Sequence, residues 1–144
     1  MLCYKKDLTR IIMEAFKRYF IDTLKYRYAQ FHGRASRSEF WYFMLFYLLI
    51  DIVLVFIDLL VVDPMLGITP DQAGQGGLLE IIYALAMLIP SIALAVRRLH
   101  DIGKSGWWYL IGLIPLVGAL VLLYFFVLDS QPGTNQYGPN PKGV

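Results

Sequence analysis

The sequence contains one cysteine and two histidines among its 144 residues, and these scarcities exclude several kinds of site. The single cysteine, Cys3, cannot form an internal disulfide bond. The histidines have no partner at metal-ligand spacing, and no serine, threonine or cysteine stands at motif spacing from a base, so neither a metal site nor a nucleophilic catalytic site is predicted. We therefore expect a protein that is not an enzyme and has no cofactor.

Charged residues are also few, at 17% of the chain against 58% apolar residues. This composition leaves too little polar surface to cover a water-soluble domain. Three apolar runs of about 20 residues each have the length that a helix needs to cross a bilayer. The sequence thus predicts an all-α, polytopic membrane protein with transmembrane segments at about Trp41–Val62, Leu78–Val96 and Trp107–Leu128. The predicted parts are an N-terminal helix (1–30), a membrane domain (31–128) and a tail rich in proline, glycine and asparagine (129–144).

The third apolar run contains Gly112, Pro115 and Gly118 near its middle. It therefore either crosses the membrane or breaks there and returns as a re-entrant hairpin. We favour the crossing, because each arm of a hairpin would have only about 10 residues, whereas a span needs about 20.

Two details of the predicted helices concern their backbone hydrogen bonds. Pro90 lacks the N–H that would bond the carbonyl of Ala86, and Ser91 or a neighbouring helix is expected to compensate. Before the first span, Ser36 or Ser38 can cap the helix that follows, and Glu39 would stabilise the dipole at the N-terminus of that helix.

The thirteen lysine and arginine residues are distributed unevenly along the chain. Nine precede Trp41, none lies in 63–77, three lie in 97–106 and one is in the tail. Because basic loops stay on the cytoplasmic side, the N-terminus and the second loop should face the cytoplasm, and 63–77 should form an outer connector. A basic face suits anionic phospholipid at least as well as nucleic acid, and no nucleic-acid-binding motif is present. We therefore expect membrane lipids and not nucleic acid as partners.

The first thirty residues have an amphipathic pattern, in which apolar residues recur at helical spacing opposite basic ones. The apolar face comprises Leu8, Ile11, Ile12, Phe16, Tyr19 and Phe20. A basic amphipathic helix of this kind lies in the headgroup layer, or packs on a partner protein or a second copy of the chain. We favour the membrane surface, because the helix is tethered beside the first span.

Two carboxylates fall inside the first predicted span. Asp51 lies about ten residues into it, near the bilayer midplane, and Asp58 follows on nearly the same face. Ionisable groups at such a depth are candidate functional residues, so the pair could line a path for protons or ions. The alternative is structural: a protonated Asp51 that hydrogen-bonds Tyr47 or Ser91.

A second group of charged residues is predicted at the cytoplasmic interface, where two segments face each other. The group consists of Arg34, Arg37 and Glu39 before the first span, and of Arg97, Arg98, His100, Asp101 and Lys104 after the second. We expect either ion pairs that join the two segments, or guanidinium groups that bind a lipid phosphate bidentately.

Three motifs occur in an order that is highly specific. They are Phe31-x-Gly33-Arg34-Ala35-x-Arg37-x-Glu39-Phe40-Trp41, then Arg97-Arg98-Leu99-His100-Asp101-x-Gly103-x-Ser105-Gly106-Trp107-Trp108, then Pro132-Gly133-x-Asn135-x-Tyr137-Gly138-Pro139. From about Phe20 to the end, the chain resembles the domain-of-unknown-function 805 family of small bacterial inner-membrane proteins. The resemblance implies a location in the bacterial inner membrane and a shared architecture, without an established activity. Asp58 matches an acidic position common in that family and Asp51 does not, which turns attention to the interfacial charges.

Two interpretations of the function follow. In the leading one, the chain is a non-enzymatic inner-membrane protein whose basic cytoplasmic face binds anionic lipid or a partner protein. In the alternative, it is a small transporter or channel subunit that uses Asp51 and Asp58. The alternative requires a homo-oligomer, because three helices enclose little lumen.

Overall fold

The computed structural model describes residues 2–69 and 77–143, and every regular element in that part of the chain is helical. The predicted outer connector includes residues 70–76, which lie outside the described residues. The elements are α1 (Leu2–Phe16), η1 (Lys17–Ile21), α2 (Asp22–Tyr26), α3 (Arg37–Ile57), η2 (Asp58–Val62), α4 (Asp63–Met65), α5 (Leu78–Asp101), η4 (Gly106–Leu113) and α6 (Val117–Val127).

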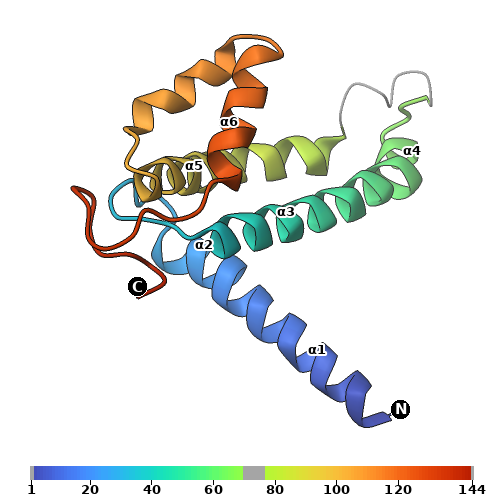
Figure 1. The fold of residues 1–144 in the computed structure, drawn as a ribbon. Helices are drawn as coiled ribbons and strands as arrows, with labels where there is room; N and C mark the ends of the chain where they lie inside the picture. The colour runs from blue at the N-terminus through green and yellow to red at the C-terminus, as the bar shows by residue number, and fades with distance from the viewer. Residues whose placement is uncertain (1, 70–76, 144) are drawn as a thin grey trace.

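Two long helical segments are apolar enough to cross a membrane, namely Arg37–Met65 with 29 residues and Leu78–Asp101 with 24 residues. They lie side by side and run in opposite directions (Figure 1). Phe43 is fully buried and Phe46 nearly so, and further along the pair the rings of Tyr47 and Tyr83 stack at 5.2 Å. The outward faces of both helices expose leucine, isoleucine and valine, a surface that suits hydrocarbon better than water.

The start of α3 is capped as the sequence predicts. Ser36 has an extended backbone, and its Oγ accepts a hydrogen bond from the backbone N–H of Glu39 at 3.2 Å. The Glu39 carboxylate therefore lies in the first turn, where the helix dipole stabilises negative charge.

The carbonyl that Pro90 leaves without a helical donor is satisfied from another segment. Tyr28, in the loop after α2, donates its hydroxyl to the carbonyl oxygen of Ala86. Ser91 bonds the carbonyl of Leu88 instead, at 3.0 Å. The donor is thus a loop residue, and neither Ser91 nor a neighbouring helix as the sequence analysis expected, and the loop becomes attached to the middle of α5.

The third apolar run does not form one span-length helix, and the crossing that we favoured from the sequence stays a prediction. It is divided into η4 and α6, and the two fold back on each other as a hairpin (Figure 1). The break falls at Pro115 and Leu116, where Leu116 adopts a φ of 63°. The arms approach so closely that a Cβ atom on Gly118 would lie 1.8 Å from the carbonyl oxygen of Ile111. Both ends of the hairpin therefore lie at the C-terminal end of α5.

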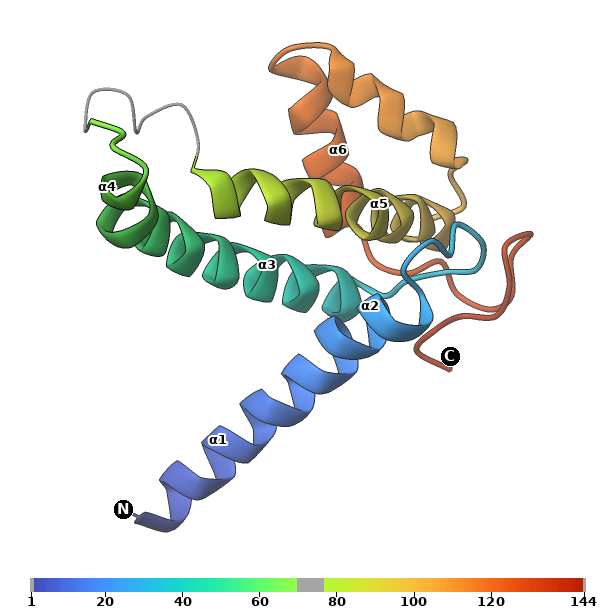
Figure 2. The same ribbon diagram turned by 180° about the vertical axis from the view of Figure 1, so that it is seen from behind.

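The N-terminal helix is nearly continuous from Leu2 to Tyr26 and projects away from the other helices, as both ribbon views show (Figures 1 and 2). Only its C-terminal half is anchored, through Phe16 and Phe20, whose rings pack on Phe46 and Phe43. Further out, Ile11 and Met13 are 61% and 65% exposed. Contact of this apolar surface with lipid stays a prediction.

Candidate functional site

Asp101 lies at the centre of a buried ion network at the end of α5. Its Oδ1 accepts a hydrogen bond from Nε of Arg34 at 3.0 Å, and its Oδ2 accepts one from Nη1 of Arg98 at 2.7 Å. The hydroxyl of Ser130 also donates to Oδ2, at 2.6 Å. All three charged side chains are at most 1% exposed. A buried carboxylate is tolerated here because two cations and a hydroxyl replace the water it loses.

The two arginines also donate to backbone carbonyls at the end of the hairpin and in the tail. Arg34 donates to the carbonyls of Gln131 at 2.5 Å and Gly133 at 2.8 Å. Arg98 donates to the carbonyls of Phe126 and Leu128 at the end of α6. These bonds fasten the tail and the hairpin to α5, so their N–H groups are engaged within the chain.

His100 anchors the tail by a ring contact. Its imidazole stacks on the phenol ring of Tyr137 at 3.8 Å with an interplanar angle of 3°, and its Nδ1 lies 3.1 Å from the carbonyl oxygen of Gly33. The side-chain amide of Asn135 donates to the carbonyl oxygen of His100 at 2.9 Å. The three motifs of the sequence thus meet at one place, which we call the junction: residues 27–36, 97–101 and 129–142.

Glu39 binds a second pair of cations at the junction. Its Oε1 accepts hydrogen bonds from Arg27 at 2.6 Å and from Arg97 at 2.7 Å. Arg97 is only 1% exposed, and its Nε and Nη2 have no hydrogen-bond partner among the described residues. One carboxylate therefore serves two guanidinium groups, and positive charge is in excess around it.

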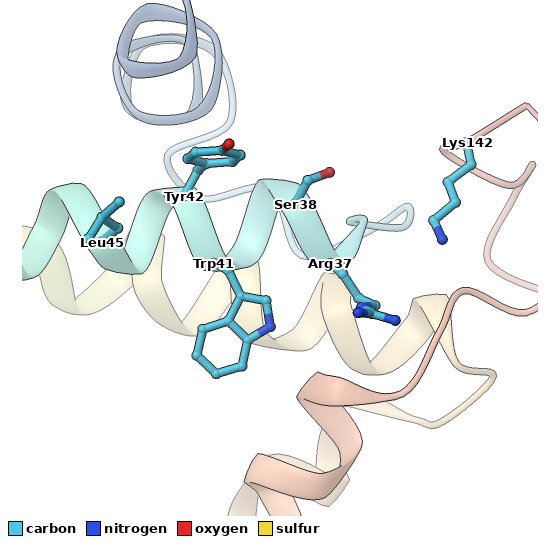
Figure 3. Close-up of a pocket in the computed structure, with 6 residues that line it drawn as sticks. All are labelled: Arg37, Ser38, Trp41, Tyr42, Leu45 and Lys142. Carbon is cyan, nitrogen blue, oxygen red and sulfur yellow. The ribbon is translucent and has the colours of Figure 1, made fainter. Parts of the chain in front are cut away.

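Arg37 and Lys142 remain accessible, with side chains 46% and 39% exposed. They lie at one end of a groove of about 490 Å³ along α3, which the close-up displays (Figure 3). The other lining residues are Ser38, Trp41, Tyr42 and Leu45. The polar groups thus stand at the N-terminal end of α3, and aromatic and aliphatic side chains follow along the helix away from them.

An exposed carboxylate, Asp129, neutralises part of the charge at this groove. It forms an ion pair with Lys142 and lies 3.9 Å from Arg37. The hydrogen bond from Lys142, followed by that from the backbone of Ser130, lowers the pKa of Asp129 below its ordinary value. Asp129 is therefore ionised at neutral pH.

Lys104 contacts aromatic rings of the hairpin. Its ammonium group stands 5.2 Å from the ring centre of Trp108 and 5.8 Å from that of Phe125, over the base of the hairpin. The chain turns at Gly103, whose φ is 73°, and the backbone N–H of Lys104 donates to the carbonyl oxygen of Leu99 at 2.9 Å, so a shared role of Lys104 with the other charged residues stays a prediction.

Asp58, which the sequence analysis paired with Asp51, binds the start of α5. The carboxylate of Asp58 is 2% exposed and accepts hydrogen bonds from the backbone N–H groups of Leu79 at 3.2 Å and Glu80 at 3.0 Å. It thus caps α5, a role that the sequence analysis missed. A Cβ atom on Gly77 would lie 2.2 Å from its Oδ2, so the cap also requires glycine there. A polar path that uses both Asp51 and Asp58 stays a prediction.

The donors available at the junction are guanidinium and ammonium groups, which bind anions. No group of three histidine, cysteine, aspartate or glutamate side chains within residues 2–69 and 77–143 is placed to hold a metal ion. The chemistry that this end of the molecule offers is therefore recognition of an anionic group next to an apolar surface.

The family model described as "Protein of unknown function (DUF805)" matches residues 28–139. The chain is 40% identical over 124 residues to the inner membrane protein YhaH of Escherichia coli K12, which covers 86% of this chain and 96% of that protein. It is 38% identical over 124 residues to the inner membrane protein YhaI of the same organism, with 86% and 95% covered. No solved structure matches the chain.

Proposed function

The chain belongs to the DUF805 family, and from this premise we propose that it is a non-enzymatic inner-membrane protein that binds an anionic phospholipid in the groove along α3. The similar proteins YhaH and YhaI are named inner membrane proteins. The observation that carries the proposal is the order of side chains in that groove. Arg37 and Lys142 stand at one end, and Trp41, Tyr42 and Leu45 extend from it along the helix. A phospholipid presents the same order, with a charged phosphate next to an acyl chain.

The position of the groove along a span supports the same ligand. It begins at the first turn of α3, where Trp41 and Tyr42 provide the amphipathic rings that gather at the level of the headgroups. Leu45 lies one turn deeper. A lipid from the adjacent leaflet could enter sideways, without crossing the protein.

The proposal includes an orientation in the membrane. The N-terminal helix, the junction and the tail lie at the end of α3 and α5 that carries the arginines, and the positive-inside rule places this end in the cytoplasm. Helices α3 and α5 are the two spans. The hairpin of η4 and α6 enters the bilayer from the cytoplasmic side and returns to it, and a second copy of the chain shields its irregular turn at Pro115, since Leu113 and Leu116 are 79% and 82% exposed.

The proposal is tested by measuring bound phosphatidylglycerol on the full-length protein with native mass spectrometry. The double substitution Arg37→Gln and Lys142→Gln should lower the affinity about thirtyfold, because each cation near a headgroup contributes about 1 kcal/mol. The control Arg10→Gln with Lys25→Gln removes the same charge from the N-terminal helix, outside the groove. Equal losses in both variants, or no loss in the first, would refute binding in the groove.

A further inference from the structure

A second cavity of about 490 Å³ lies next to the groove, between the N-terminal helix, the start of α3 and the tail. We call it the chamber. Four cationic side chains and a single carboxylate line it. These are Arg18, Arg27, Arg34 and Lys142, with Glu39 as the carboxylate, and the remaining lining residues are Tyr19, Ser36, Ser38 and Pro141.

The positive charge of the chamber is not balanced within the described residues. Arg34 is paired with Asp101, but Glu39 is the shared partner of Arg27 and Arg97 through a single oxygen atom. Two nitrogens of Arg97 are buried without a hydrogen-bond partner in that part of the chain. Arg97 does not line the chamber, but because it shares the Glu39 carboxylate, that carboxylate only partly balances the four cations that do, and the chamber favours an additional anion.

The chamber and the groove are neighbours that share part of their lining. Ser38 and Lys142 line both cavities. Tyr19 of the chamber stacks on Tyr42 of the groove, with ring centres 5.1 Å apart and an interplanar angle of 5°. An elongated ligand could therefore occupy both cavities at once, with Lys142 between its two parts.

Building on the proposed groove, we infer that the chamber binds a second phosphate of the same lipid, so that the preferred ligand is a phospholipid with two phosphates, such as cardiolipin. One phosphate binds Arg37 and Lys142 at the groove, and the other binds Arg18 and Arg27 in the chamber. A soluble phosphate compound would satisfy the cations of the chamber equally well. The lipid is favoured because the chamber lies next to the aromatic and aliphatic walls of the groove, which a soluble ion leaves unused.

The test uses the full-length protein in nanodiscs of neutral lipid, with cardiolipin and phosphatidylglycerol titrated separately. The wild type should bind cardiolipin about tenfold more tightly than phosphatidylglycerol. Arg18→Gln should reduce this preference about fivefold and leave phosphatidylglycerol binding unchanged, because Arg18 lines the chamber and not the groove. Arg27→Gln should act in the same direction. Arg10→Gln, an exposed arginine on the same helical segment that pairs with Glu14, is the matched control and should change neither affinity.

The outcomes separate this inference from the proposed function. Equal binding of the two lipids by the wild type would overturn the second phosphate site and leave the groove in place. Binding of neither lipid would overturn the proposed function itself. Loss of the cardiolipin preference on addition of glycerol phosphate would show that the chamber binds a soluble phosphate compound, and would overturn the lipid as its ligand.

Discussion

Nε of Arg34 and Oδ1 of Asp101 are 3.0 Å apart, although the two residues are separated by 67 positions in the sequence. Both side chains are at most 1% exposed. Beside this ion pair, the backbone N–H of Ala35 donates to the carbonyl oxygen of Arg97 at 3.0 Å. The loop before α3 is therefore fixed to the end of α5 by both side-chain and backbone bonds, and the tail is assembled on that fixed surface.

The first prediction concerns Arg98. Arg98→Ala should lower the free energy of unfolding by up to about 3–5 kcal/mol, because it leaves part of the Asp101 carboxylate and two backbone carbonyls buried without a donor. Arg10→Ala should cost about 0–1 kcal/mol, since the Arg10–Glu14 pair is exposed. Thermal unfolding of both variants in the same detergent measures the difference. Equal behaviour would mean that the buried arginine serves only to orient the chain in the membrane.

The second prediction concerns the hydroxyl of Tyr28. Tyr28→Phe should cost about 1–3 kcal/mol, because the carbonyl of Ala86 loses its donor and Pro90 cannot replace it. In a Pro90→Ala background, an N–H becomes available to the same carbonyl, so Tyr28→Phe should cost less there. A double-mutant cycle on thermal stability measures this coupling. Additive effects would show that the hydroxyl does not compensate for the proline.

The membrane class, the capping of α3 and the meeting of charged residues at one end of the helices could be predicted from the sequence. The hydrogen-bond partners of those charged residues were harder to predict. Arg34 and Arg98 could be assigned to a common interface from charge distribution and motif order. Their bonds to carbonyls of Gln131 and Leu128 could not, because a backbone acceptor has no residue-specific signal in a sequence. The tail was therefore expected as a separate segment, whereas it contributes a wall of the junction.

The sequence left the third apolar run open between a crossing helix and a re-entrant hairpin, because its length favours the first and its interruptions favour the second. Pro115 and the glycines on either side were recognised, but hydropathy remained high throughout the run. What decides the fold is local sterics: only glycine at position 118 allows the close approach to Ile111. Asp58 shows the same limit, since a side chain that caps a helix 21 residues further on cannot be recognised from spacing alone.

The third prediction concerns the side of the membrane on which the tail lies. In a Cys3→Ser background, a cysteine at Gln136 should be protected from a membrane-impermeant maleimide in intact cells and labelled after permeabilisation, because the hairpin returns the chain to the side of the junction. A cysteine at Met65, which is 81% exposed at the opposite end of α3, should be labelled without permeabilisation and serves as the control. Labelling at Gln136 from outside would indicate that the third run crosses the membrane.

The fourth prediction concerns Asp129, which competes with a lipid phosphate for Arg37 and Lys142. Asp129→Asn should strengthen phosphatidylglycerol binding several-fold, because it frees both cations of the groove and removes a negative charge that repels the headgroup. Asp7→Asn removes the same charge from the exposed surface of α1 and should leave the affinity unchanged.

The pH dependence of this competition follows from the lowered pKa of Asp129. A carboxylate whose pKa is depressed in the folded protein takes up a proton only below its ordinary range, so Asp129 stays charged from about pH 5 to about pH 8. The ratio of the two affinities, Asn variant to wild type, should therefore be constant across that interval and should fall toward one only at lower pH. Native mass spectrometry or nanodisc titration at several pH values measures this ratio. An unchanged affinity in the Asn variant at neutral pH would show that Arg37 and Lys142 do not bind the phosphate.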